Sequence, residues 1–342
     1  MYKAKPTLVE TLRKMAEAAH KHVEGRNKRK IGLEVEEVKK PVFVERPMFD
    51  TYASELINRF EAKEGGQEWL EWKSEQKVPS ASMLSSVFGV GYRPFKEEIE
   101  TVLKIREQKP TDSFFVAKLL EHGQTYEMVA ADLYSSDHDI KKNEIVGGPI
   151  NSAVYRLTIG TKTYDFLITP DMVYVHPERG TCVVEFKCPG YGIAVKRNEN
   201  VSISDLCVKF NSKHERGRLH HFVQVAAYAV TLKARYFYLY YLFTEGINQY
   251  TIEYQYQVTH DVIDLIEYAL SVCKEYIDRY YEDIKNTGKC TIFDYPIQRT
   301  AKMYSKRVET VMKADGVFIN SFIKCHCKVE DLQEESPDDG EQ

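Results

Sequence analysis

The spacing of apolar residues along the chain changes from helical to strand-like and back again. Spacings of three and four residues predict helices at 7–23, 49–62, 83–88, 97–109 and 114–134. Between 153 and 187 apolar and polar residues alternate around turns at 160–161 and 178–180, which predicts an antiparallel β-meander. Beyond it we expect a polar loop at 190–214, strands at 235–243 and 249–257, and helices at 215–232, 260–285 and 299–314.

This order of elements predicts an α/β protein with a mixed central β-sheet flanked by helices. No internal repeat occurs at the usual solenoid periods, so one main domain is expected. We predict a helical N-terminal extension over residues 1–65, a main domain over 66–328 and an acidic, disordered tail over 329–342.

Composition narrows the class of protein. The 342 residues are 43% hydrophobic and 29% charged, without an apolar stretch long enough to span a membrane. The N-terminal sequence lacks the apolar core of a secretory signal, and the seven cysteines are scattered, which favours reduced thiols. We therefore expect an intracellular protein that is neither secreted nor membrane-bound. A net charge of −4 argues against a protein that coats nucleic acid, but it leaves room for a local basic groove.

The residues whose side chains indicate a chemical function most clearly lie between 169 and 187. Strand alternation places Glu185 and Lys187 on one face, with Phe186 turned into the core, and Asp171 begins the neighbouring antiparallel strand. Two carboxylates and one ammonium should therefore converge at one end of the sheet. Carboxylates bind Mg²⁺, which neutralises charge on a phosphodiester and makes a water molecule more acidic. On its own, however, an Asp with a Glu-x-Lys is more often a solvated polar face.

Four short segments, in matching order, extend this pattern. The sequence TPDMVYVHPERGTCVVEFKCPG at 169–190 resembles the Ser-Pro-Asp-Gly, hairpin and Glu-Ile-Lys-Cys-Pro strand of the lambda-type (YqaJ-like) viral recombinase exonucleases, which belong to the PD-(D/E)XK superfamily. The segment 122–127 is similar to that family's Gly-x-x-x-Glu helix, and 224–228 to its Gln-x-x-x-Tyr motif. The segment 80–89 resembles the family's Ala-Ser-containing segment at the DNA end. Two departures are that Met172 replaces a glycine and that no arginine stands before Ser82 at the position where the family reads a phosphate.

The resemblance implies a restriction-endonuclease-like core and a set of roles. Glu127, Asp171, Glu185 and the carbonyl of Phe186 would bind the metal ion, and Lys187 would position the attacking water. Gln224 and Tyr228 would complete the catalytic site. The residues expected to bind DNA are Ser82, Lys73, Lys77, His122, Arg216 and Arg218. The alternative for the two arginines is an ordinary solvated basic loop.

The function that the resemblance implies is Mg²⁺-dependent digestion of double-stranded DNA ends in the 5′-to-3′ direction, with Mn²⁺ as a substitute cation. Such an enzyme would serve recombination or viral genome processing, in the cytoplasm or nucleus of a host cell, beside a single-strand annealing protein. Two alternatives stay open. One is an endonuclease or RNA-degrading relative, and the other is a catalytically silent nucleic-acid-binding module. The sequence leaves the oligomeric state undetermined. A zinc site at 325–327 is not favoured, because paired ligand spacings are absent elsewhere.

Overall fold

The computed structural model describes residues 49–60, 67–104, 114–147, 152–189, 202–245, 248–288 and 301–326. All of them lie in the second of two units into which the chain divides, Pro47–Gln342. The expected helix at 7–23 and the expected tail at 329–342 lie outside the described residues. The three-part domain division stays a prediction.

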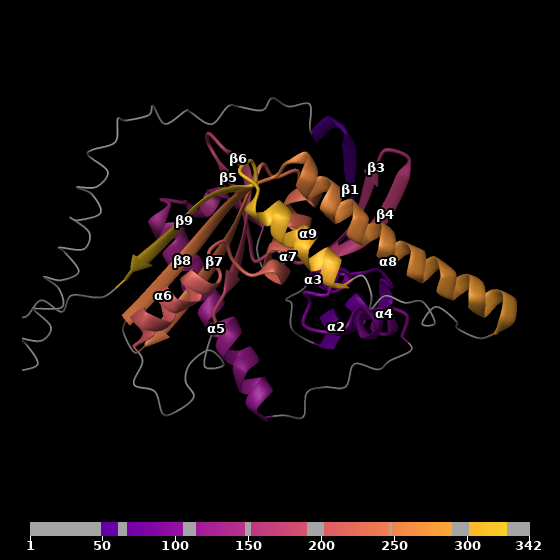
Figure 1. The fold of residues 1–342 in the computed structure, drawn as a ribbon, viewed down its shortest axis with the longest axis horizontal. Coiled ribbons are helices and arrows are strands. Elements are labelled where there is room, and N and C mark those ends of the chain that lie inside the picture. Colours follow the sequence, from indigo (N-terminus) through magenta and orange to yellow (C-terminus); the bar gives the residue numbers. More distant parts are fainter. Residues whose placement is uncertain are drawn as a thin grey trace, which may run out of the picture. The chain divides into compact units, whose positions relative to one another are not determined.

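A six-stranded sheet forms the centre of the described unit (Figure 1). Its order is β2 (Ile145–Gly147), β5 (Met172–His176), β6 (Gly180–Lys187), β7 (Tyr236–Glu245), β8 (Asn248–Gln257) and β9 (Phe318–Cys325). β6 and β7 run parallel, whereas every other neighbouring pair is antiparallel. The predicted mixed sheet is therefore confirmed. Strand β9 was not predicted.

Helices cover both faces of this sheet, as predicted. One face packs against α7 (Leu219–Thr231) and α6 (Ile203–Lys213). Helices α3 (Ala81–Val87), α8 (His260–Thr287) and α9 (Ala301–Lys313) pack onto α7, and α4 (Phe95–Val102) packs against α3 and α8. The other face packs against α5 (Phe114–Asp137). Alternate residues of β6 and β7 enter the two cores, so that Val183 and Leu239 face α7 while Phe186 and Tyr240 face α5.

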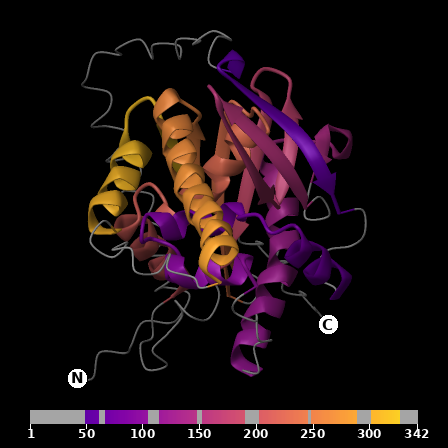
Figure 2. The same cartoon turned by 90° about the vertical axis from the view of Figure 1, so that its right-hand side faces the viewer.

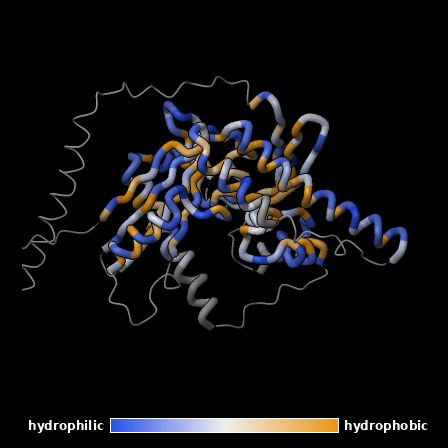
Figure 3. Tube along the Cα trace, in the orientation of Figure 1, coloured by the Kyte–Doolittle hydropathy of each residue, from blue (hydrophilic) through white to orange (hydrophobic). Residues whose placement is uncertain are grey.

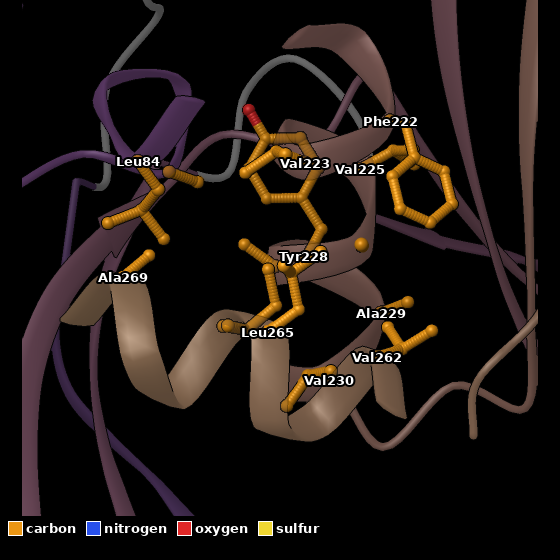
Figure 4. Close-up of a cluster of buried hydrophobic side chains, with 14 of the residues drawn as sticks. Leu84, Phe222, Val223, Val225, Tyr228, Ala229, Val230, Val262, Leu265 and Ala269 are labelled. Atoms are coloured by element: carbon orange, nitrogen blue, oxygen red, sulfur yellow. The ribbon is translucent and has the colours of Figure 1, made fainter. Parts of the chain in front are cut away.

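Helix α7 is buried almost all round, which fits its largely apolar sequence. Figure 4 shows Val223, Tyr228 and Val230 of this helix in one cluster with Leu84 of α3 and Leu265 of α8. The Tyr228 hydroxyl points away from Leu265 in that view. By contrast, the C-terminal third of α8 is largely hydrophilic and leaves the core, as its colouring in Figure 3 shows.

A second, three-stranded sheet corrects the predicted meander. Its order is β1 (Tyr52–Arg59), β3 (Ala153–Ile159) and β4 (Lys162–Ile168), and α8 runs beside it in Figures 1 and 2. The hairpins β3–β4 and β5–β6 form as predicted, but β4 and β5 belong to different sheets. Pro170 stands between them, where it lacks the backbone N–H that a continuing ladder requires. The prediction of a helix at 49–62 is wrong, because residues 52–59 pair with β3.

The predicted loop at 190–214 is also wrong in its second half, which forms α6. Ser202 caps this helix by accepting a hydrogen bond from the Asp205 N–H, and Cys207 and Phe210 bury its inner face. Helix α2 (Gln67–Glu75) was not predicted, and α4 ends at Val102, with residues 105–109 outside the described part. The helices predicted at 83–88, 114–134, 215–232, 260–285 and 299–314 are confirmed as α3, α5, α7, α8 and α9.

Candidate active site

The start of β5 and the end of β6 bring Asp171, Glu185 and Lys187 together. The register Met172↔Val184 places Asp171 beside Glu185, and the Phe186 N–H donates to Asp171 Oδ2 at 2.8 Å. Lys187 Nζ donates to Glu185 Oε1 at 2.5 Å and lies 3.8 Å from Asp171 Oδ2. Alternation along β6 turns Phe186 into the core on the α5 side, so the two charged side chains share the opposite face.

Helix α7 holds the Glu185 carboxylate from the side. Gln224 Nε2 donates to Glu185 Oε1 at 2.7 Å and to the Tyr228 hydroxyl at 2.8 Å, which uses both hydrogens of the amide. Gln224 and Tyr228 lie four residues apart and therefore share one face of the helix. Because the Tyr228 side chain is buried in the hydrophobic core, its hydroxyl holds the side-chain amide of Gln224 against Glu185.

Glu127 approaches from α5, on the other side of the sheet. Burial, together with the Asp171 carboxylate, raises the pKa of its carboxyl to about 7, although Lys187 acts to lower it. Glu127 is therefore close enough to interact with the β5–β6 pair. We call Glu127, Asp171, Glu185 and Lys187 the acidic cluster.

The carboxyl groups of the acidic cluster hold their protons more tightly than usual, because their pKa values are raised. Burial raises the pKa of Glu185 well above its usual value, and the Asp171 carboxylate adds to this effect while Lys187 opposes it. Burial also raises the pKa of Asp171, against the effects of Lys187 and the Phe186 N–H. Burial alone would lower the pKa of Lys187, but Glu185 and Asp171 together keep it well above the usual value. Three carboxyl groups thus share one ammonium.

One atom of this cluster suits a hard cation. Glu185 is 1% exposed, and its Oε2 atom is buried without a hydrogen-bond partner among the described residues. A buried carboxylate oxygen with no partner is costly unless a cation or a donor compensates it. Across the described residues, no three His, Cys, Asp or Glu side chains form a ready-made metal site. Mg²⁺ nevertheless needs only one or two protein carboxylates together with water, and Asp171 and Glu185 meet that requirement.

The residues expected to bind DNA are dispersed. Ser82 is exposed at the start of α3, with its Oγ 3.0 Å from Ser80 Oγ, and Lys73 Nζ lies 4.9 Å from the ring centre of Trp69. Lys77 lines a separate cavity of about 900 Å³ between β4 and α8. The His122 side chain lies outside the described part of the chain.

Arg216 and Arg218 line a second cavity, of about 700 Å³, between the 212–220 turn and α9. We call it the basic cavity, although Glu215 and Glu309 also line it. Arg216 donates to the Lys313 carbonyl and packs 4.4 Å from the Phe318 ring centre. The Nε atom of Arg218 is buried and has no partner among the described residues, and the guanidinium lies 5.0 Å from the Phe210 ring centre.

Sequence reasoning missed one feature beside the site, the Tyr92 side chain. Its hydroxyl lies 2.7 Å from His221 Nε2. An aromatic residue immediately after the helix-ending turn Gly89–Gly91 was the available signal.

A mixed sheet between helices, with an acid before one strand and Glu-x-Lys at the end of its neighbour, is the α/β arrangement that the sequence predicted. Residues 68–231 match the family model of the YqaJ-like viral recombinase domain. This segment contains Asp171, Glu185 and Lys187 and is similar to that family, as its sequence predicted. The match supports a nuclease, whereas the role of each residue stays a prediction.

Two similar solved structures are of LHK-Exo. The alkaline exonuclease from Laribacter hongkongensis is 12% identical, with 65% of this chain and 98% of that chain covered and a TM-score of 0.43. LHK-Exo in complex with dAMP is 13% identical, with 64% and 97% covered and a TM-score of 0.40. The structure of SSO0001 is 12% identical, with 66% and 94% covered and a TM-score of 0.30. A search of curated proteins found no match. No described helix is long and apolar enough to cross a membrane.

Proposed function

We propose that this protein is a Mg²⁺-dependent deoxyribonuclease that digests one strand from the ends of double-stranded DNA, in the 5′-to-3′ direction. The observation that carries the proposal is the buried, unpartnered Oε2 atom of Glu185 beside Asp171 and Lys187. Such an arrangement destabilises the fold unless a cation or a proton compensates it, and a cation would compensate all the carboxylates at once. The match of this segment to a viral recombinase domain supports DNA as the substrate.

In the proposed mechanism Asp171, Glu185 and the Phe186 carbonyl would hold the cation, and Glu127 would be a further ligand. When bound, the cation supplies positive charge for the phosphate and makes a water molecule more acidic. The Phe186 N–H holds the Asp171 carboxylate in place, and Gln224 holds that of Glu185. Because the pKa of Lys187 is well above its usual value, Lys187 stays protonated. It therefore acts as a donor that positions the attacking water and stabilises phosphate charge, and not as a base.

The DNA backbone would contact the basic residues around this site. Arg216 and Arg218 line the basic cavity and are the first candidates, and Lys73, Lys77, Ser82 and His122 are the further candidates. Contacts of this kind bind phosphates without regard to sequence and weaken as salt is added. A strand shortened in this way would pass to a single-strand annealing protein during recombination or viral genome processing, inside a host cell.

The proposal can be tested by incubating linear and circular duplex DNA of the same sequence with Mg²⁺ or with EDTA. We expect degradation of the linear DNA alone, and only with Mg²⁺. Cleavage of both forms, or of RNA in preference to DNA, would show the endonuclease or RNA-degrading alternative. Binding of DNA without cleavage would show a silent module. Strands labelled at either end establish the direction, and duplexes with and without a 5′-phosphate show whether that group is required.

A further inference from the structure

Tyr92 presents an aromatic ring to solvent next to the acidic cluster. Its side chain is 76% exposed, the highest value among the large hydrophobic side chains of the described residues. The ring is nonetheless held in place. Its hydroxyl lies 2.7 Å from His221 Nε2, and its ring makes a T-shaped contact with the His220 ring with 4.4 Å between ring centres. One surface of a fixed aromatic ring is thus left open.

The backbone that carries Tyr92 is fixed as well. Gly89 adopts a left-handed φ of +67°, which ends α3. A Cβ atom on Gly91 would lie 2.0 Å from Ser86 Oγ, so the loop lies directly against the helix. Ser86 Oγ also donates to the Arg93 carbonyl at 2.9 Å. Contacts on both sides of Tyr92 therefore limit the motion of the loop.

His221 connects Tyr92 to the core of the protein. It is 3% exposed, and its Nδ1 lies 2.8 Å from the Tyr241 hydroxyl. The Arg218 N–H donates to the same hydroxyl at 3.4 Å. A neutral His221 ring accepts a hydrogen bond from one of the two tyrosine hydroxyls and donates one to the other. Burial lowers the pKa of His221 well below its usual value, which keeps the ring neutral, as this arrangement requires.

Tyr92 also lies between two regions that the proposed function assigns to DNA. His221 is three residues before Gln224 on α7, so the two share a face of the helix, and Gln224 donates to Glu185. On the other side, Val90 and His220 line the basic cavity together with Arg218. A DNA strand with one phosphate at the acidic cluster and another at Arg218 passes the open surface of the Tyr92 ring.

We propose that Tyr92 is a nucleobase-stacking residue that positions the substrate strand beside the acidic cluster. This inference rests on the proposed function and adds a binding residue to it. Stacking on an aromatic ring accepts any base, because every base has a π-face. A residue of this kind suits an enzyme that must bind each successive nucleotide of a strand. Tyr92 is a positioning residue, since the acidic cluster performs the chemistry without it.

The test compares Tyr92→Ala with Tyr92→Phe, and uses Tyr281→Ala as the matched control. Tyr281 is a half-exposed tyrosine on the distal part of α8. The probe is a duplex with 2-aminopurine in its terminal nucleotides, bound in the presence of Ca²⁺ to prevent cleavage. We expect Tyr92→Ala to weaken binding about 5- to 150-fold, from the usual range of base–aromatic stacking, and to abolish the quenching of 2-aminopurine on binding. Tyr92→Phe should retain the quenching, and Tyr281→Ala should match the wild type.

With Mg²⁺, Tyr92→Ala should raise KM and leave kcat close to that of the wild type. Equal binding and equal quenching by Tyr92→Ala and the wild type would overturn the proposal. Equal losses in Tyr92→Phe and Tyr92→Ala would also overturn it, because they would assign the effect to the hydroxyl. A wild type that binds and quenches but never cleaves would refute the proposed function and leave the stacking role standing. A wild type that neither binds nor cleaves DNA would refute both.

Discussion

The carboxyl group of Glu127 should make the free energy of unfolding depend on pH when no divalent cation is present. Burial and the Asp171 carboxylate raise its pKa from the usual 4.5 to about 7. The folded protein therefore binds this proton more tightly than the unfolded chain does. The resulting stabilisation is fully present below about pH 4.5 and is lost as the pH rises through about 7. The shift corresponds to about 3 kcal/mol, which solvent at this half-buried side chain reduces to about 2 kcal/mol.

Glu127→Gln keeps the shape of the side chain and removes its titration. Urea unfolding in EDTA, at about pH 5 and about pH 8, measures the free energy of unfolding of both proteins. Between these two values we expect the wild type to lose about 2 kcal/mol relative to the variant. Glu178→Gln, on the exposed β5–β6 turn, is the control and should follow the wild type. Parallel pH profiles for the wild type and Glu127→Gln would refute the placement of Glu127 beside Asp171.

Three further results are expected. Lys187→Ala should keep the fold and DNA binding but lose most turnover with Mg²⁺, and an active variant would contradict the role of this ammonium. Asp171→Ala should weaken Mn²⁺ binding in a direct titration, and unaltered affinity would remove Asp171 from the metal ligands. Gly217→Ala should cost about 1–3 kcal/mol more in urea unfolding than Gly160→Ala. Both glycines have positive φ, but only at Gly217 would a Cβ lie 2.8 Å from the Tyr256 hydroxyl and 2.9 Å from Leu239 Cδ1.

The strands that carry the acidic cluster could be predicted because their pattern is local. Alternation alone placed Glu185 and Lys187 on one face, and the turn at 178–180 fixed the antiparallel partner. The register Met172↔Val184 then follows from the length of that turn. Likewise, Gln224 and Tyr228 share a helix face at any tilt of α7, although their contact with Glu185 depends on packing that the sequence does not reveal.

Strand β1 shows where local patterns fail. Residues 52–59 have no strong strand propensity, and their helical spacing misled the prediction. They form a strand because they pair with β3, which is about a hundred residues away along the chain, and such pairing overrides local preference. Helix α6 is a different case. Ile203, Cys207 and Phe210 have helical spacing after the capping Ser202, so the signal was present and was overlooked.

The position of Tyr92 could not be predicted from the sequence. It meets His221 across 129 residues, and neither residue belongs to a recognisable motif. The contact arises because α3 packs on α7, which brings the loop after one helix to the start of the other. A side chain placed by the packing of two helices, and not by one strand or one turn, requires the three-dimensional structure.

The alternation of β6 also explains how charged groups come to lie inside the protein. Phe186 packs against Tyr134 of α5, at 5.8 Å between ring centres. Glu127 lies seven residues before Tyr134, on the same face of that helix, so this contact directs its carboxyl toward the end of the sheet. On the opposite face, α7 fixes Glu185 through Gln224. Packing on both faces therefore forces carboxylates together that would otherwise repel one another. A divalent cation relieves that repulsion directly, so folding stability and metal binding should be coupled in this protein.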